Sequence, residues 1–109
     1  MAGMMYLLIA IIAEVIGTTA LKSSNGFSNL FPSIIVVVSY VLSFFLLGMS
    51  LKTIPLGIGY ALWSGIGTAL TIIIGVVVWK EAMSLASVLG ILLILSGVVI
   101  LNMNKVGIG

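Results

Sequence analysis

The chain has 109 residues, of which 62% are hydrophobic and 6% are charged, and its formal net charge is +2. Soluble domains carry about 25% charged residues, so six charges cannot cover the surface of a soluble monomer of this size. Residues 23–51, 53–79 and 82–104 contain no charge at all. Each stretch exceeds the roughly 20 residues that cross a bilayer, so we expect an integral membrane protein.

Missing residue types exclude several functions. The sequence has no cysteine and no histidine, and its acidic residues are two glutamates. Thiol chemistry, imidazole bases and the usual metal-ligand sets therefore lack the side chains they need. We expect no catalytic residue, no metal, no cofactor and no enzyme activity. Four lysines without arginine also argue against nucleic acid, which needs a concentrated basic surface.

Continuous apolar runs predict an all-α protein with four transmembrane helices. We place these helices at about 4–21, 33–51, 58–79 and 86–104. Unbroken apolar runs favour helices over the alternating pattern of a membrane β-barrel. Pro32 suits the first turn of the second helix, and Ser84 is a candidate N-cap for the fourth. The spans fill most of the chain, so we expect one membrane domain over residues 1–109.

The lysines do not favour one orientation in the membrane. Four spans place both termini on the same side, together with Lys52 and Lys105, while Lys22 and Lys80 lie on the other side. Lysine and arginine in short loops normally set the orientation, and here the count is two against two. Either the chain inserts both ways, so that two copies meet as an inverted repeat, or other determinants fix one orientation.

One charge is predicted to lie inside the bilayer. Glu14 falls near the middle of the first predicted helix, where an ionisable group costs roughly 2.5–3.5 kcal/mol on insertion scales. The low dielectric disfavours the ionised form, so this carboxyl is suited to exchanging a proton for another cation. The alternative is a protonated glutamate that forms a structural hydrogen bond.

Small residues share the helical face of Glu14. Leu7, Ala10, Gly17 and Thr18 lie three, four or seven residues from it along the first helix, which places them on the same side. Such a face leaves room for a ligand, although small residues also permit close packing of helices.

Aromatic residues in the next two helices suggest a cation site. Tyr60 and Trp63 share one face of the third helix, and Tyr40 lies three residues before Ser43 in the second. Aromatic faces attract cations, so these residues and Glu14 together indicate a site for hydrophobic cations. Aromatic residues also collect at membrane interfaces, which is the alternative for Tyr60 in particular. Trp63 lies deeper in its helix.

Glycines mark two further features. Gly65 and Gly67 fall inside the third helix and indicate either a hinge or a close helix contact. Gly90 and Gly97 are seven residues apart on one face of the fourth helix. That face indicates an assembly surface or a contact with another helix of the same chain.

Several motifs together resemble the small multidrug resistance (SMR) family over nearly the whole chain. The motifs are Ala-Glu-Val-Ile-Gly-Thr-Thr at 13–19 with Lys22, Gly26-Phe27, Pro32-Ser33, Ile-Pro-Leu-Gly-Ile-Gly-Tyr-Ala-Leu-Trp-Ser-Gly-Ile-Gly at 54–67, and the glycines of the fourth helix. The Gly-Thr-Thr sequence and Tyr40 resemble the quaternary-ammonium exporter subtype more than the guanidinium exporter subtype.

The resemblance implies an antiparallel, dual-topology dimer in the plasma (inner) membrane of a prokaryote. This dimer would export lipophilic and quaternary ammonium cations in exchange for protons, and the partner would be a second copy or a close paralogue. Glu14 would bind protons and substrate in competition. The implied substrate-lining residues are Tyr40, Tyr60, Trp63, Leu7, Ala10, Thr18 and Ser43, the implied hinge is Gly65 and Gly67, and the implied dimer interface is Gly90 and Gly97. The alternatives are a guanidinium or small-cation exporter and a non-transporting membrane subunit.

Overall fold

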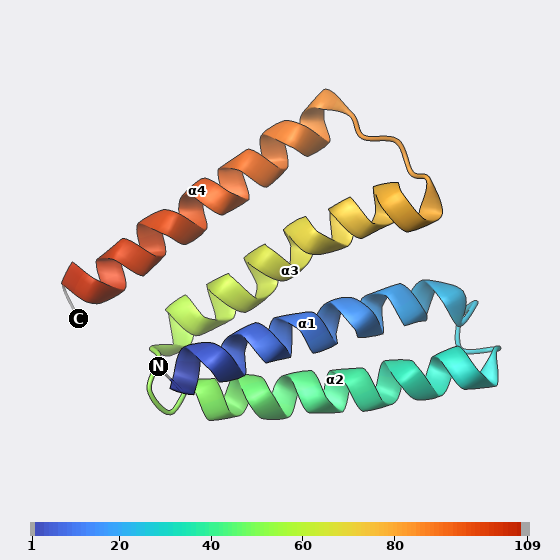
Figure 1. Cartoon of the computed structure of the whole chain (residues 1–109), viewed down its shortest axis with the longest axis horizontal. Coiled ribbons are helices and arrows are strands. Elements are labelled where there is room, and N and C mark those ends of the chain that lie inside the picture. Colours follow the sequence, from blue (N-terminus) through green and yellow to red (C-terminus); the bar gives the residue numbers. More distant parts are fainter. Residues whose placement is uncertain (1, 108–109) are drawn as a thin grey trace.

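Four helices make up nearly all of the described chain. The computed structural model describes the backbone of residues 2–107 and the side chains of residues 2–103, so the side chain of Lys105 lies outside the described residues. The helices are α1 (Ala2–Ser23), α2 (Leu30–Ser50), α3 (Leu56–Trp79) and α4 (Leu85–Gly107) (Figure 1). All four are long and apolar enough to cross a membrane, which confirms the predicted four-helix membrane fold.

Helix ends follow hydrogen bonding more closely than they follow hydropathy. α1 includes Lys22 and Ser23, beyond the apolar run, because its backbone continues to form helical hydrogen bonds where the sequence becomes polar. At the start of α4 the predicted N-cap is confirmed, since Ser84 Oγ accepts a hydrogen bond from the backbone N–H of Ser87 at 3.1 Å. The apolar runs therefore mark the spans but not their last residues.

The helices lie side by side in the order α2, α1, α3, α4 (Figure 1). α1 packs against both α2 and α3, whereas α4 packs against α3. The arrangement is flat, with principal dimensions of 46 × 34 × 17 Å. Its buried core lies among the first three helices and includes Leu7, Ile11, Leu47, Leu62 and Trp63. A row of helices cannot enclose its apolar surface, so lipid or a second chain must cover the remainder.

α4 illustrates this exposure most clearly. Within its span Leu85–Met103 no residue is buried by the rest of the described chain. A Cβ placed at Gly90 or Gly97 would meet nothing within 4 Å. Among the described residues, then, no helix of the same chain packs on these two glycines. Their spacing therefore does not reflect a helix contact within one copy, which was the alternative to an assembly surface.

Candidate functional site

Glu14 lies on α1, and its carboxylate lies against α3 at Gly67. Its Oε1 is buried and has no hydrogen-bond partner among the described residues. On α3, Gly67 faces the carboxylate so closely that a Cβ at this position would overlap it. The absence of a side chain at Gly67 therefore makes room for the carboxylate. An unsatisfied buried polar group costs about 1–3 kcal/mol, so this arrangement is unfavourable unless a proton or a cation meets the oxygen.

The second glycine of α3 faces a different neighbour. A Cβ at Gly65 would lie 3.3 Å from Ile94 and 3.5 Å from Val98, both on α4. α3 runs as one helix from Leu56 to Trp79 through both glycines. Each glycine thus serves a close approach, one to a carboxylate and one to a helix, while the predicted hinge at this point stays a prediction.

One chain of hydrogen bonds ties together α1, α2 and α3. The Trp63 indole N–H donates to Ser43 Oγ at 2.9 Å, and Ser43 Oγ donates to the backbone carbonyl of Ala10 at 2.7 Å. Ser43 is fully buried and Trp63 is 7% exposed, so both bonds are shielded from competing solvent. Ser43 therefore fixes the orientation of the indole ring of Trp63.

A second hydrogen bond connects α1 and α2. The hydroxyl groups of Thr18 and Tyr40 are bonded to each other. Thr18 lies one helical turn after Glu14, and Ala10 lies one turn before it. The two hydrogen-bonded connections therefore flank the carboxylate along α1 and hold Tyr40 and Trp63 on either side of it.

Two other aromatic rings lie next to Trp63, and the three residues are called the aromatic group below. The ring of Tyr60 lies 5.6 Å from that of Trp63, at an interplanar angle of 42°, and the ring of Phe44 lies 5.2 Å away at 50°. Phe44 was not predicted from the sequence. It follows Tyr40 by four residues, so the helical spacing of aromatic residues in α2 was the available signal. Tyr60 is 54% exposed and presents its ring to whatever lies against this face.

The predicted lining residues fall into two groups. Glu14, Thr18 and Tyr40 keep part of their surface exposed, whereas Leu7 and Ala10, like Ser43, have none. The first group can contact a ligand directly in this conformation, and the second group supports it. Gly90 and Gly97 lie apart from both groups on α4. The roles of all these residues stay predictions.

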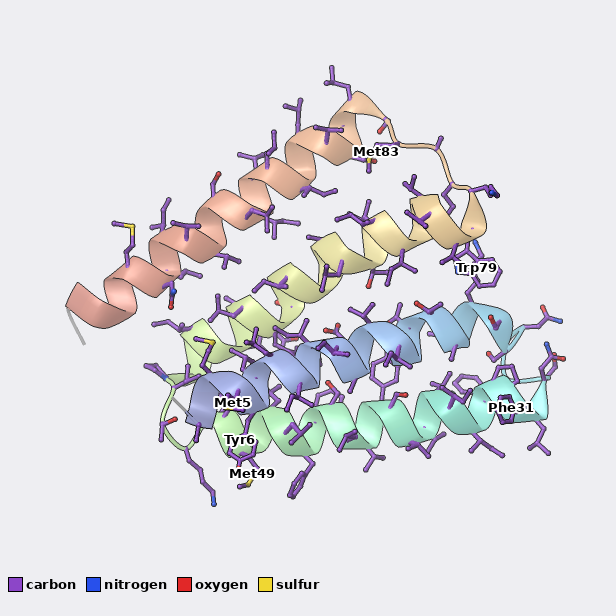
Figure 2. The ribbon with its side chains drawn as sticks, viewed as in Figure 1. Met5, Tyr6, Phe31, Met49, Trp79 and Met83 are labelled. Carbon is purple, nitrogen blue, oxygen red and sulfur yellow. The ribbon has the colours of Figure 1, made fainter. Side chains whose placement is uncertain are left out.

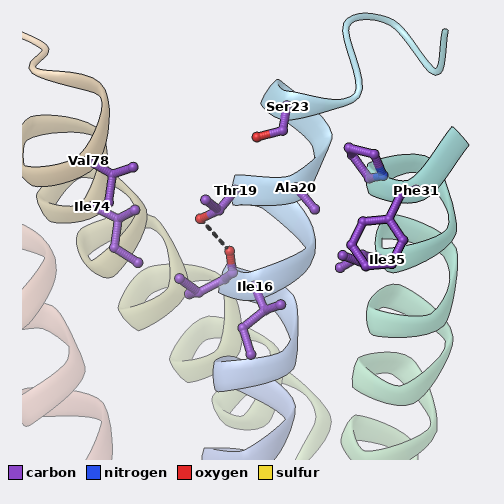
Figure 3. Close-up of a pocket in the computed structure, with 10 residues that line it drawn as sticks. Ile16, Thr19, Ala20, Ser23, Phe31, Ile35, Ile74 and Val78 are labelled. Atoms are coloured by element: carbon purple, nitrogen blue, oxygen red, sulfur yellow. Dashed lines mark hydrogen bonds between the residues drawn. The ribbon is translucent and has the colours of Figure 1, made fainter. Parts of the chain in front are cut away.

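The chemistry of the site suits an organic cation. The carboxyl group has no partner among the described residues and lies against Gly67, one helical turn after Trp63 on α3, so charge neutralisation and cation–π attraction are available from neighbouring parts of the site. Among the described residues no cluster of histidine, cysteine, aspartate or glutamate could hold a metal ion. A cavity of about 550 Å³ lies elsewhere, between the other face of α1 and the ends of α2 and α3, and does not include Glu14 (Figure 3).

Comparison with known proteins gives consistent matches over most of the chain. The family model described as Small Multidrug Resistance protein matches residues 2–94. The multidrug resistance protein EbrB of Bacillus subtilis (strain 168) is 48% identical over 105 residues, which cover 96% of this chain and 90% of the relative. EbrA of the same strain is 50% identical and covers 92% and 95%. The quaternary ammonium compound-resistance protein QacH of Staphylococcus saprophyticus is 46% identical and covers 90% and 92%.

Proposed function

The chain belongs to the small multidrug resistance family of multi-pass plasma-membrane transporters, and from this membership we propose that it exports lipophilic and quaternary ammonium cations in exchange for protons. The single observation that carries the proposal is Glu14 Oε1, which is buried and has no hydrogen-bond partner among the described residues. A buried carboxyl group that the protein itself leaves unpaired is available to a proton or to a cationic ligand.

Competition between a proton and a cation for Glu14 would couple export of the cation to entry of protons. A bound proton neutralises the carboxyl, and a bound organic cation neutralises the carboxylate, so one group cannot hold both at full strength. The chain then changes the side to which it opens when either is bound. The proton gradient drives export because protons displace the cation on the side where they are abundant.

The aromatic group supports the choice of a hydrophobic cation. Organic cations lose their water shell easily and gain about 2 kcal/mol or more against a desolvated ring. Trp63 is held in one orientation by Ser43, and Tyr60 is exposed beside it. In this conformation the ring of Tyr60 would contact the alkyl or aryl groups of the cation, with Trp63 packed behind it, while Glu14 meets the charge.

A second chain is part of the proposal. The exposed face of α4, with open space at Gly90 and Gly97, suits a close helix contact between two chains. Equal numbers of lysines on the two sides of the membrane favour an antiparallel pair. The partner is a second copy or a close paralogue, and two such relatives, EbrA and EbrB, occur in one strain of Bacillus subtilis.

Transport by a Glu14→Gln variant tests the proposal most directly. Glutamine keeps the shape of the side chain but binds neither a proton nor a cation by charge. In proteoliposomes with a pH gradient, we expect the unaltered chain to move tetraphenylphosphonium and the variant to move none above background. Proton-driven transport by Glu14→Gln would overturn the proposal, and a matched Lys52→Gln variant controls for the loss of a charge elsewhere.

The pH dependence of binding tests the competition separately. If one proton leaves Glu14 for each cation bound, the affinity for the cation should fall about tenfold for each unit by which the pH is lowered, in the range where the carboxyl is protonated. Binding that does not change with pH would contradict a shared site. A panel of guanidinium and tetraalkylammonium ions, measured in the same assay, identifies the substrate class, and selective transport of guanidinium would replace the quaternary ammonium assignment.

A further inference from the structure

A second carboxylate lies at the loop end of the helices and holds a lysine. Lys22 Nζ of α1 is 2.7 Å from Glu81 Oε2, in the loop between α3 and α4. The same Nζ lies 5.2 Å from the centre of the Trp79 ring. Figure 2 shows Trp79 at the end of α3, on the side that faces α1. An ammonium group between a carboxylate and an aromatic ring is the arrangement by which proteins recognise organic cations.

The position of Glu81 is set by the backbone. Its N–H donates to the carbonyl of Gly75 at 3.1 Å, and Lys80 before it adopts a left-handed conformation with a φ of 60°. This turn folds the carboxylate back over Gly75, where a Cβ would overlap it. The carboxylate is thus preorganised, although the side chains of Lys22 and Glu81 are 52% and 51% exposed.

Two cavities meet beside this ion pair. A smaller cavity of about 120 Å³ is lined in part by Thr18, Thr71 and the three residues of the cation arrangement, Lys22, Trp79 and Glu81. An apolar cavity of about 550 Å³ lies between α1, α2 and α3, and Figure 3 shows its walls. Thr19 and Ile74 line both cavities. The two cavities are therefore neighbours, the smaller one beside the ion pair and the larger one lined mostly by apolar residues.

The apolar cavity extends along α1 toward the depth of Glu14 but lies on another face of the helix. Its α1 wall extends from Ser23 down to Ile16 and Val15, a rise of about 12 Å at 1.5 Å per residue. Ile16 and Ala20 point to the side of α1 opposite Glu14, because successive residues turn by about 100°. The apolar cavity therefore lies on a different face of α1 from Glu14.

We propose that the two cavities form a peripheral binding site for single-chain cationic amphiphiles, which carry a quaternary ammonium headgroup on an alkyl chain. The headgroup takes the place of Lys22 Nζ between Glu81 and Trp79, and the alkyl chain fills the apolar cavity. Lys22 is then an internal competitor that occupies the headgroup position when no ligand is bound. The inference extends the proposed function, from which it takes the ligand class, but the site does not include Glu14 and shares only Thr18 with the residues proposed for transport.

Fluorescence of Trp79 reports binding at this site. The chain has two tryptophans, so Trp63→Phe leaves Trp79 as the sole emitter, and Glu14→Gln in the same chain removes the central carboxylate. Dodecyltrimethylammonium is titrated into this double variant in phosphatidylethanolamine and phosphatidylglycerol vesicles. We expect a saturable change in Trp79 emission, with a much weaker response to tetramethylammonium, which has no chain, and to dodecyl maltoside, which has no charge.

Two further substitutions test whether Glu81 binds the amphiphile or only forms a structural ion pair with Lys22. Glu81→Gln should weaken binding about fivefold, since the headgroup loses the attraction of an exposed carboxylate. Lys22→Gln should strengthen binding, because it removes the competitor. Lys52→Gln, an exposed lysine elsewhere on the chain, should leave binding unchanged. If Lys22→Gln weakens binding as Glu81→Gln does, or if emission changes without saturation in all variants alike, the proposal is wrong.

Choline lipids share this chemistry and form the last arm of the test. Adding phosphatidylcholine to the vesicles should leave the titration unchanged, and abolition of the response would assign the site to lipid and overturn the proposal. The readout needs no transport, so failure of proton coupling at Glu14 and failure of this site are distinguishable. Loss of the response when Glu14 is replaced, with Glu81 intact, would show that the amphiphile binds at the central carboxyl alone.

Discussion

The two glutamates of this chain lie in similar surroundings at two depths. Each carboxylate lies over a glycine of α3, Gly67 for Glu14 and Gly75 for Glu81. Each of these glycines is four residues from a tryptophan of the same helix. The difference is the counter-charge: Lys22 holds Glu81, whereas Glu14 Oε1 has no partner among the described residues.

This difference has a physical reason. An exposed ion pair keeps most of its hydration and contributes about 0–1 kcal/mol, so it forms and opens easily. A lysine placed beside Glu14 would form a buried pair that is strongly destabilising to break, at about 3–5 kcal/mol. Such a pair could not exchange its cation. An unpaired carboxyl in the interior is therefore the form that suits transport, and a loosely paired carboxylate at the end suits reversible binding.

Substitution of Gly67 and Gly75 tests the comparison of the two glutamates, and Gly67→Ala should have the largest effect of the changes considered. Gly67→Ala places a methyl group where the Glu14 carboxylate lies, and misplacing a reacting group by about 1 Å can cost on the order of a hundredfold. We expect uptake of tetraphenylphosphonium in proteoliposomes to fall at least about tenfold on the same scale. Gly75→Ala displaces only the exposed carboxylate of Glu81, and uptake should stay within about twofold. Equal losses in the two variants would remove the distinction between the glutamates.

Loss of the Ser43 hydroxyl should have an intermediate effect. Ser43→Ala leaves the Trp63 indole N–H without its buried acceptor, which costs about 1–3 kcal/mol. We expect a lower midpoint of thermal unfolding in detergent and weaker cation binding, since the ring of Trp63 is no longer fixed. Ser96→Ala is the matched control, because Ser96 is exposed on α4 and bonds within its own helix. A stable Ser43→Ala variant with unaltered binding would exclude a positioning role.

Removal of the exposed ion pair should have the smallest effect on stability. Lys22→Gln breaks the contact with Glu81, and the free energy of unfolding should change by about 1 kcal/mol or less. The change should shrink further in high salt, which screens exposed charges. Denaturation in detergent at low and high ionic strength measures this. A loss as large as that of Ser43→Ala would mean that the pair holds the fold together.

The sequence predicts the spans well and their contacts less well. Length and hydropathy are local properties, so four apolar runs are enough to predict four helices. Glu14 stands out for the same reason, because it is a charge inside an apolar run. Phe44 was missed because its four-residue spacing from Tyr40 marks a shared helix face but does not say which helix that face meets. Its contact with Trp63 depends on how α2 and α3 are rotated about their axes.

The sequence by itself determined that this is a four-span membrane protein with one charge in its interior, because hydrophobic length and charge do not depend on packing. Only the tertiary structure decided that Gly67 faces that charge, that Ser43 holds Trp63, and that Lys22 meets a carboxylate 59 residues further along the chain. These contacts join different helices, and no local pattern fixes the rotation and separation of one helix against another. Packing sets both, and so decides which of two similar carboxylates is left without a partner.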